Sequence, residues 1–284
     1  MKRLLNSGFL RMALGLLLLC ASICSASAGQ GSKTVSIHQV PAAVKKTIED
    51  QATGFKLGDI EREETDGEVT YTAKISKEGQ ESDFTVAEDG RLLTVEVELE
   101  ETPSAVQKTI KAQVGEGEVD SIEKNVEEDD YEVEFVRKDG TDSFFSVRPD
   151  GKLSTVQVTL SEIPAAVRKT IEANLGKGKL GNVYRLSEDA AVSYDAEVKY
   201  EEKPRELVIA ENGKLESVQV SLSETPEPVQ KTIKEKLGDG KLIRIDRSFE
   251  QKMGVMPYEV EARKDGKPFN FSVGPRGRFL GMDE

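Results

Sequence analysis

Apolar and polar positions follow a pattern along this chain that returns four times. Each copy begins with a proline, and apolar residues then occupy every fourth position, as at Val106, Ile110 and Val114. This spacing places the apolar side chains on one face of a short amphipathic helix. The prolines that open the copies (Pro41, Pro103, Pro164 and Pro226) stand 62, 61 and 62 residues apart. A fixed period of this size predicts one folding unit used four times.

The ends of the helices carry recognisable signals. Thr102 and Thr225 precede the proline in two copies and are predicted N-caps, with proline at the first helical position. Val40 and Ile163 replace the threonine in the other copies and cannot cap. A glycine follows each apolar stripe, where a left-handed C-terminal cap is expected: Gly54, Gly115, Gly176 and Gly238.

Strand patterns fill the rest of each copy. Alternating apolar and polar residues begin at a tyrosine, as in Tyr131-Glu-Val-Glu-Phe135, which is typical of a half-buried strand. Hairpin turns are predicted at Glu78-Gly79, Asp139-Gly140 and Asp265-Gly266, and second turns at Asp89-Gly90, Asp150-Gly151, Asn212-Gly213 and Arg276-Gly277. A last strand (Val95 to Leu99 in the first copy) ends three residues before the next proline, and the fourth copy is expected to lack it.

The predicted fold class is α+β. We expect four tandem repeats of about 61 residues, each a short helix packed on an antiparallel sheet of about four strands, joined by tight links. The expected bounds are 1–28 for a signal peptide, 29–39 for an entry strand, and 40–101, 102–162, 163–224 and 225–284 for the four repeats.

The N-terminus resembles an export signal. Lys2, Arg3 and Arg11 give a basic start, Met12 to Leu19 is apolar, and Ala26-Ser27-Ala28 offers small residues for cleavage. The apolar run is short for a membrane span, although retention as an uncleaved anchor stays an alternative. The sequence therefore predicts a periplasmic or secreted protein with no membrane attachment after cleavage.

Charge and cysteine content narrow the function classes. Loss of residues 1–28 would remove both cysteines, Cys20 and Cys24, and would change the net charge from −13 to −16. So acidic a chain is expected to bind no nucleic acid, because phosphates would be repelled. It fits a protein, expected to be a monomer, whose partner is basic or a cation.

Reactive side chains are scarce. His38 is the single histidine and lies outside the repeated core, so Cys–His and zinc-type histidine clusters are unavailable. The acidic run Glu127 to Asp130 has no EF-hand spacing and is expected to be a solvated turn. We therefore predict no catalytic, cofactor-binding or metal-binding residues, no cofactor, and a protein that is not an enzyme.

The order of motifs resembles the PepSY and PepSY-like (beta-lactamase-inhibitor-like) domains. The second copy carries the resemblance most fully, with Tyr131-Glu-Val-Glu-Phe-Val-Arg-Lys-Asp-Gly140 and Phe145-Ser-Val-Arg-Pro-Asp-Gly-Lys-Leu153. The third copy, with Glu201-Glu-Lys-Pro204 in place of a turn, departs from the pattern. The resemblance spans about Thr34 to Glu284 and implies an exported, non-catalytic domain of the kind found in propeptides of thermolysin-type peptidases and in stand-alone envelope proteins.

The predicted function is binding of another protein in the envelope or outside it, with inhibition of a peptidase or other hydrolase as one form of that binding. A structural or adhesive repeat array and a cation-binding acidic protein are the alternatives. Four recurring tyrosines are the candidate partner contacts, although each ring could instead cover its own sheet or helix: Tyr71, Tyr131, Tyr194 and Tyr258.

Overall fold

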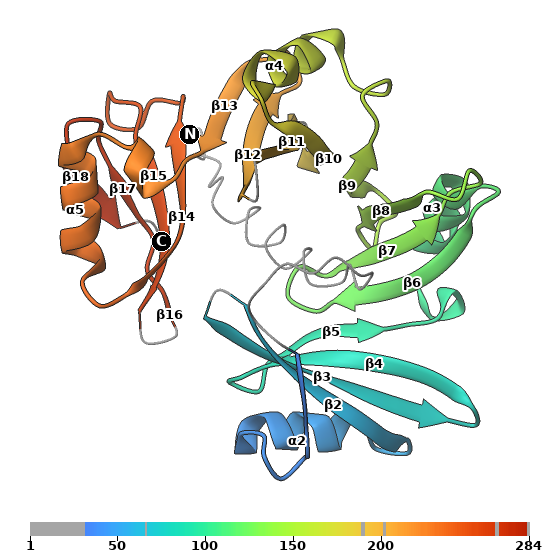
Figure 1. The fold of residues 1–284 in the computed structure, drawn as a ribbon. Helices are drawn as coiled ribbons and strands as arrows, with labels where there is room; N and C mark the ends of the chain where they lie inside the picture. The colour runs from blue at the N-terminus through green and yellow to red at the C-terminus, as the bar shows by residue number, and fades with distance from the viewer. Residues whose placement is uncertain (1–31, 66, 189–190, 201–202, 265–266, 283–284) are drawn as a thin grey trace. The chain divides into compact units, whose positions relative to one another are not determined.

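The computed structural model describes residues 32–65, 67–188, 191–200, 203–264 and 267–282 (Figure 1). The expected signal peptide (1–28), both cysteines and the Asp265-Gly266 turn lie outside the described residues. None of the helices in the described part of the chain has the length and apolar character needed to cross a membrane.

Helices and strands occur in the chain in four successive groups. The first comprises β1 (Lys33–Val35), α2 (Ala42–Gln51), β2 (Lys56–Thr65), β3 (Glu68–Lys77), β4 (Gln80–Ala87) and β5 (Leu92–Glu96). The second comprises η1 (Leu99–Glu101), α3 (Ser104–Val114), β6 (Glu118–Asn125), β7 (Asp130–Val136), β8 (Asp142–Val147) and β9 (Leu153–Val158). The third comprises α4 (Ala165–Leu175), β10 (Lys179–Glu188), β11 (Ala191–Tyr200), β12 (Lys203–Ala210) and β13 (Leu215–Gln219). The fourth comprises η2 (Leu222–Glu224), α5 (Glu227–Leu237), β14 (Lys241–Ser248), β15 (Tyr258–Lys264), β16 (Lys267–Pro268), β17 (Phe271–Val273) and β18 (Phe279–Met282).

Every strand pairing among the described residues is antiparallel, and the pairing continues from one group to the next. The strand before each helix hydrogen-bonds with the strand after it, so that Val95 of β5 lies opposite Lys124 of β6. The same arrangement joins β1 to β2, β9 to β10 and β13 to β14. Each helix therefore connects two strands that are themselves neighbours in the sheet.

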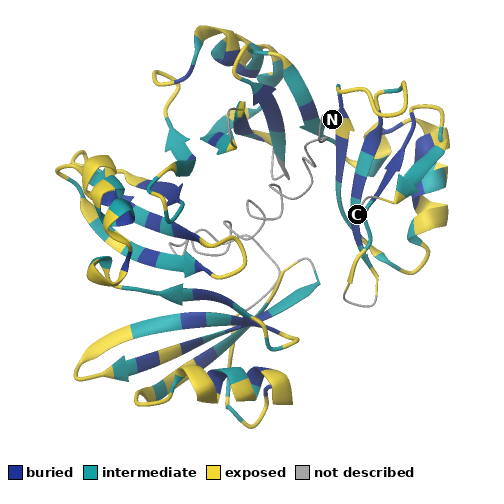
Figure 2. Cartoon of the chain, turned by 180° about the vertical axis from the view of Figure 1, so that it is seen from behind, coloured by how far each residue is buried: buried dark blue, intermediate teal, exposed yellow. Residues whose placement is uncertain are grey.

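Each helix covers its own hydrophobic core. In the second group, Val106 and Ile110 of α3 are buried against Val133 of β7 and Phe145 and Val147 of β8. Equivalent clusters form under α2, α4 and α5, and the outer side of each helix is exposed (Figure 2). Helices packed on an antiparallel sheet confirm the α+β class.

A recurring hydrogen bond ties each helix to the last turn of its sheet. The hydroxyl of Thr109 in α3 donates to the carbonyl oxygen of Gly151 at 2.7 Å. Thr47, Thr170 and Thr232 make the same bond to Gly90, Gly213 and Gly277 at 2.7, 2.6 and 2.6 Å. We call this contact the helix–turn clasp, and it explains why threonine returns in every copy.

Thr109→Val is expected to lower the free energy of unfolding by about 1 kcal/mol, because valine keeps the shape but leaves the Gly151 carbonyl without its donor. Urea unfolding of the full chain measures the change. Thr53→Val is the control, since its hydroxyl bonds the Glu49 carbonyl at an exposed position. Equal stability of the two variants would contradict a structural role for the clasp.

Two expectations about the helix ends are wrong. Thr102 and Thr225 do not cap α3 and α5, because their hydroxyls donate to the carbonyls of Leu99 and Leu222 in the preceding 3₁₀ turns, both at 2.8 Å. Proline occupies the cap position itself, with no side-chain cap bond. In the first copy α2 ends at Gln51, and Ala52 rather than Gly54 is its C-cap residue.

The C-terminal glycines of the other three helices have positive φ (53° to 59°) but ψ from −114° to −119°, which is outside the left-handed helical region. Positive φ is therefore confirmed there, whereas the expected left-handed helical cap is not the conformation found.

The fourth copy does have a last strand, contrary to expectation. β18 pairs with β17, with Phe271 opposite Met282 and Val273 opposite Phe279. Phe279 follows Gly277 at the same distance at which Leu153 follows Gly151, so the four residues of β18 suffice to continue the pattern.

Candidate functional site

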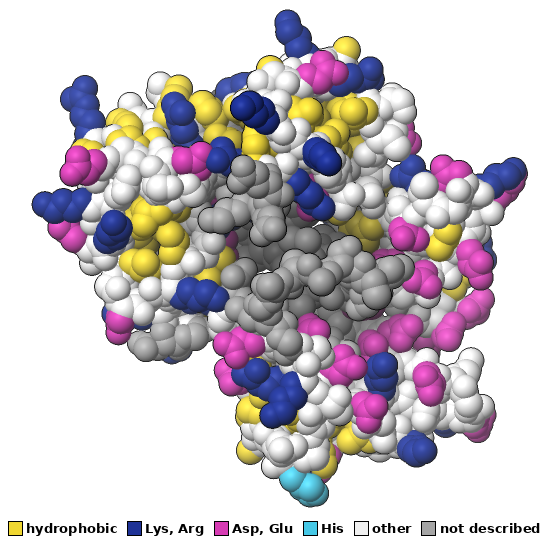
Figure 3. Space-filling model, viewed as in Figure 1, with side chains coloured by type: hydrophobic (Ala, Val, Ile, Leu, Met, Phe, Trp, Pro, Cys, Tyr) yellow, Lys and Arg dark blue, Asp and Glu magenta, His cyan; other side chains and the backbone are white. Residues whose placement is uncertain are grey.

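The two sides of the sheet differ in chemistry. In β7, Tyr131, Val133 and Phe135 belong to the core under α3. Side chains alternate along a strand, so Glu132 and Glu134 lie on the side away from the helix. We call this side the acidic face. Acidic side chains gather over β5 and β6 in the space-filling view (Figure 3).

Four carboxylates on successive strands form a row across the acidic face, which we call the carboxylate row: Asp83 of β4, Glu96 of β5, Glu123 of β6 and Glu132 of β7. The register places Glu96 opposite Glu123 and Glu123 opposite Glu132. The backbone N–H of Asp83 donates to Glu96 Oε2 at 3.1 Å. Like charges directly opposite each other in a sheet are destabilising.

Neutral or basic residues lie at the two ends of the row. Lys74 of β3 pairs with Asp83 at one end, and Ser146 of β8 pairs with Glu132 at the other. Elsewhere on the acidic face a cation lies between acidic groups, since Arg244 bonds both Glu206 and Asp246. Within the carboxylate row, the side chains that face each other are themselves acidic.

Three carboxyl groups of the row, those of Asp83, Glu96 and Glu132, have raised pKa values. Burial raises the pKa of Glu132 to about 8, and the charges of Asp130, Glu123 and Glu128 add to the shift, although a hydrogen bond from Asn125 opposes it. Burial is also the main cause of the raised pKa of Asp83 and of Glu96. Glu134, next along β7, has its pKa raised to about 7 by burial and by neighbouring acidic groups.

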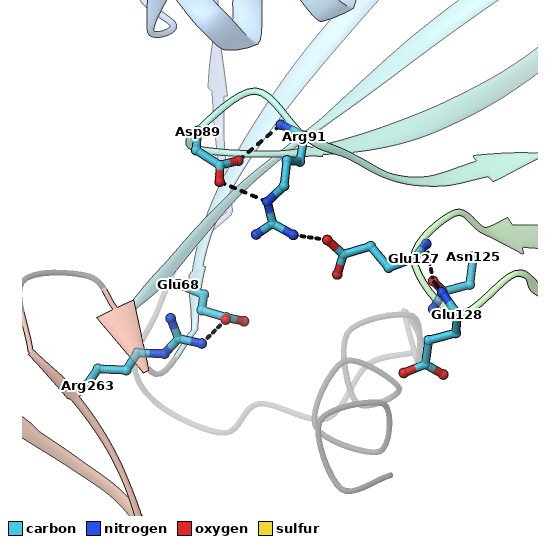
Figure 4. Close-up of polar contacts among 7 residues, drawn as sticks. All are labelled: Glu68, Asp89, Arg91, Asn125, Glu127, Glu128 and Arg263. Atoms are coloured by element: carbon cyan, nitrogen blue, oxygen red, sulfur yellow. Dashed lines mark hydrogen bonds and ion pairs between the residues drawn. The ribbon is translucent and has the colours of Figure 1, made fainter. Parts of the chain in front are cut away.

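Asn125 and Asp130 hold the turn beside the row. Asn125 Oδ1 accepts the backbone N–H groups of Glu127 and Glu128 at 3.2 and 3.1 Å (Figure 4). Its Nδ2 donates to Glu132 Oε1 at 3.4 Å. Asp130 is buried: its Oδ2 accepts from the Ser154 hydroxyl at 3.2 Å, whereas its Oδ1 has no hydrogen-bond partner. The turn is therefore an ordered acidic turn.

An ion pair closes the same end of the β5–β6 junction. Arg91, which precedes β5, bonds Asp89 through Nε at 2.8 Å and also pairs with Glu127 after β6 (Figure 4). The junction between the first and second groups is thus joined by backbone bonds, by this pair and by the turn of Asn125.

The four recurring tyrosines lie in the cores, not on the acidic face. Their exposed fractions are 4%, 6%, 3% and 7% for Tyr71, Tyr131, Tyr194 and Tyr258. This burial agrees with the alternative in which each ring covers its own sheet or helix. Contact between the rings and a partner stays a prediction, to which this burial gives no support.

The remaining candidates carry little chemistry. His38 is exposed in the turn before α2. Among the described residues no three His, Cys, Asp or Glu side chains are grouped so that they could hold a metal ion. The negative charge of the acidic face is suited to attracting cationic groups.

Sequence reasoning missed the carboxylate row. The alternation in Tyr131-Glu-Val-Glu already places Glu132 and Glu134 on one side of the strand. The position of Glu96 opposite Glu123, however, depends on the register between β5 and β6, which α3 separates in the chain. The local pattern of apolar and polar residues does not reveal that register.

Comparisons with known proteins address the family to which the chain belongs. The family model described as "Putative beta-lactamase-inhibitor-like, PepSY-like" matches residues 30–94, 94–154 and 150–217. None of the curated proteins matches the sequence.

Similar solved structures include three Bacteroides proteins. A BLIP-like protein from Bacteroides fragilis is 10% identical over 43% of this chain and 85% of its own, with a TM-score of 0.33. A "putative periplasmic" protein from Bacteroides eggerthii is 21% identical over 40% and 85%, with a TM-score of 0.31. A "putative calcium-regulated periplasmic protein" from Bacteroides thetaiotaomicron is 16% identical over 46% and 97%, with a TM-score of 0.30. Because the family model covers well over half of its residues, the chain belongs to the PepSY-like, beta-lactamase-inhibitor-like family.

Proposed function

We propose that this chain is an exported, non-catalytic protein that binds a basic surface of another protein through its acidic face. The carboxylate row carries the proposal, because four facing carboxylates destabilise the free protein and would be stabilised by a cationic partner. The family and the scarcity of reactive side chains support a binding role.

We also propose that the chain consists of four PepSY-like units with the bounds 40–101, 102–162, 163–224 and 225–284, after an entry strand at 29–39. The family model matches three successive segments. A helix, a hydrophobic cluster and a clasp of the same kind recur in the fourth group. The shared strand pairing supports tight links between units.

The proposed location is the periplasm or the exterior, reached through the N-terminal signal, with the chain acting as a monomer. The basic and apolar start of the sequence supports export, and proteins of similar fold are described as periplasmic. The proposed partner is an extracytoplasmic hydrolase, which the rigid sheet would inhibit by covering its surface.

Long side chains on the acidic face would form charge-assisted hydrogen bonds with lysine or arginine of the partner. Binding would keep the carboxylates ionised and so lower their raised pKa values. Affinity should therefore fall with added salt and with acidification through the range in which Glu134 and Glu132 titrate, about 7 and about 8.

Neutralising the row (Asp83→Asn, Glu96→Gln, Glu123→Gln and Glu132→Gln together) is expected to weaken partner binding at least about tenfold, because the cationic groups lose their counter-charges. The immobilised full chain is incubated with envelope extract, and a saturable protein is sought that salt releases and whose hydrolase activity falls when it is bound.

The matched control neutralises four exposed helix carboxylates: Glu49, Glu172, Glu227 and Glu235. It removes the same charge from another surface and should retain the partner. If both variants lost the partner, net charge rather than the carboxylate row would explain the binding, which would contradict the proposal. If both variants retained the partner, the proposal would also be overturned.

A further inference from the structure

Two aromatic side chains lie on the acidic face where the second group meets the third. Tyr184 of β10, which is not one of the four recurring tyrosines, is partly exposed and lies opposite Gln157 of β9. Its ring meets that of Phe144 of β8 edge-on, with the ring centroids 6.5 Å apart. The hydrophobic clusters under α3 and α4 include neither ring. We call Phe144 and Tyr184 the aromatic pair.

Carboxylates lie on both sides of the aromatic pair. Glu134 lies opposite Phe144, and the backbone N–H of Asn182 donates to Glu197 Oε2 at 3.3 Å. Among the described residues, Glu134 and Glu197 form no ion pair. Burial raises the pKa of Tyr184 to about 12, and the charges of Glu197, Glu134 and Glu206 add to the shift, against a hydrogen bond from Asn182. The ring is therefore close enough to these carboxylates to feel their charge.

The charges around Glu134 are themselves acidic. The pKa of Glu134 is raised by burial first and then by Glu123, Asp120 and Asp142. Because no cation contributes to this shift, Glu134 lies in a locally negative part of the acidic face.

Nearby basic side chains do not occupy the site. Arg244 pairs with Glu206 and so neutralises only that carboxylate. Lys199, two residues along β11 from Glu197, is exposed and forms no ion pair with it.

Arg137 lies on the other side of the sheet. Its Nη2 donates to the hydroxyl of Ser143 at 2.9 Å, and Ser143 lies opposite the core residue Phe135. The guanidinium therefore bonds a side chain on the helix side, away from the aromatic pair.

The same chain shows how an arginine binds to such a ring. The Arg205 guanidinium carbon lies 4.8 Å from the ring centroid of Tyr200, and Arg205 also pairs with Glu224. A planar guanidinium can stack on a ring and bond a carboxylate at the same time, whereas the ammonium of lysine is a compact point charge. No cation from the described residues lies over the Tyr184 ring. The aromatic pair thus has the ring and the carboxylates of this arrangement without the guanidinium.

We propose that the aromatic pair is the place on the acidic face where an arginine side chain of the partner protein binds. The guanidinium stacks on the exposed part of Tyr184 and bonds the Glu197 carboxylate, and Glu134 beyond Phe144 adds attraction. This inference rests on the proposed binding of a basic partner surface and adds a preference for arginine over lysine. Tyr184 is then the residue that determines this preference.

The test compares two labelled peptides of equal length, identical except that every basic position is arginine in one and lysine in the other. Fluorescence anisotropy with the full chain gives both dissociation constants. The wild type is expected to bind the arginine peptide about fivefold more tightly, as one cation–π contact would provide. Tyr184→Leu should bring the ratio of the two constants close to one, and Tyr184→Phe, which keeps the ring, should preserve the ratio.

Phe249→Leu is the matched control. It removes another partly exposed ring, but one whose centroid already has the Arg247 guanidinium carbon 5.0 Å away. The preference for arginine should therefore stay at the wild-type value. Loss of the preference in this variant as well as in Tyr184→Leu would overturn the inference, because removal of either ring would then have the same effect.

The remaining outcomes separate this inference from the proposed function. If the wild type bound both peptides equally and the variant with the neutralised carboxylate row bound neither, the arginine site would be overturned and the acidic face would stand. An unchanged ratio in Tyr184→Leu would also overturn the arginine site. If the wild type bound neither peptide, the arginine site and the proposed function would both be overturned. The wild-type ratio needs no variant, so poor folding of Tyr184→Leu would not prevent the test.

Discussion

Gly151→Ala is expected to lower the free energy of unfolding by about 3 kcal/mol. Gly151 has a φ of +83°, which strains any side chain. A Cβ atom there would also lie 2.9 Å from the carbonyl oxygen of Ala105 in α3. Because the clasp bond from Thr109 holds the helix against this turn, relief requires the helix to move away and opens the core under α3. Urea unfolding of the full chain measures the loss.

Gly140→Ala is a matched control for this substitution. Gly140 has the same φ of +83° in the same group of strands, but nothing lies within 4 Å of a Cβ built there. We expect it to cost about 1 kcal/mol, from backbone strain alone. If Gly151→Ala and Gly140→Ala lowered the free energy of unfolding equally, the turn at Gly151 could move away from α3 at no cost. The close approach of this turn to α3 would then not contribute to stability.

Glu132→Gln is expected to stabilise the protein by about 2–4 kcal/mol at pH 8, with little effect at pH 4. The pKa of Glu132 is about 8 in the fold and 4.5 as its unperturbed value. The folded state therefore binds more protons than the unfolded state between these values, and the stability of the wild type falls as the pH rises through them. Glutamine removes the charge and keeps an oxygen for Asn125.

Unfolding free energies of wild type and variant, measured at pH 4 and pH 8, test this expectation. Glu172→Gln on the exposed surface of α4 is the control and should change neither value appreciably. If Glu132→Gln destabilised the protein at pH 8, the carboxylate would be favourably paired in the fold and the row would not be a source of repulsion.

Local patterns predicted most of the fold. Val106 and Ile110 lie in the core as their spacing requires, and the alternation from Tyr131 to Phe135 places its apolar residues beneath α3. The N-cap prediction was wrong because the Thr102 hydroxyl can form either of two local hydrogen bonds. In the structure it donates to the Leu99 carbonyl in the preceding 3₁₀ turn instead of capping α3. Sequence pattern alone does not indicate which of two local hydrogen bonds is the more stable.

The site was less accessible to sequence reasoning. Recurrence drew attention to the tyrosines, which the fold needs in its cores, and away from the glutamates between them. The positions of Glu96 and Glu123 opposite each other follow from pairing across α3, which couples residues 27 apart in the chain.

The pairing of strands on either side of each helix has a consequence for how such a chain can grow or be cut. If the chain were divided between β5 and β6, both fragments would lose the backbone hydrogen bonds that join these strands. Each fragment would then have an unpaired edge strand, which could pair with another copy and lead to aggregation. Among the described strands, β1 and β18 each pair with a single neighbour, so gain or loss of modules should be easiest at these two strands.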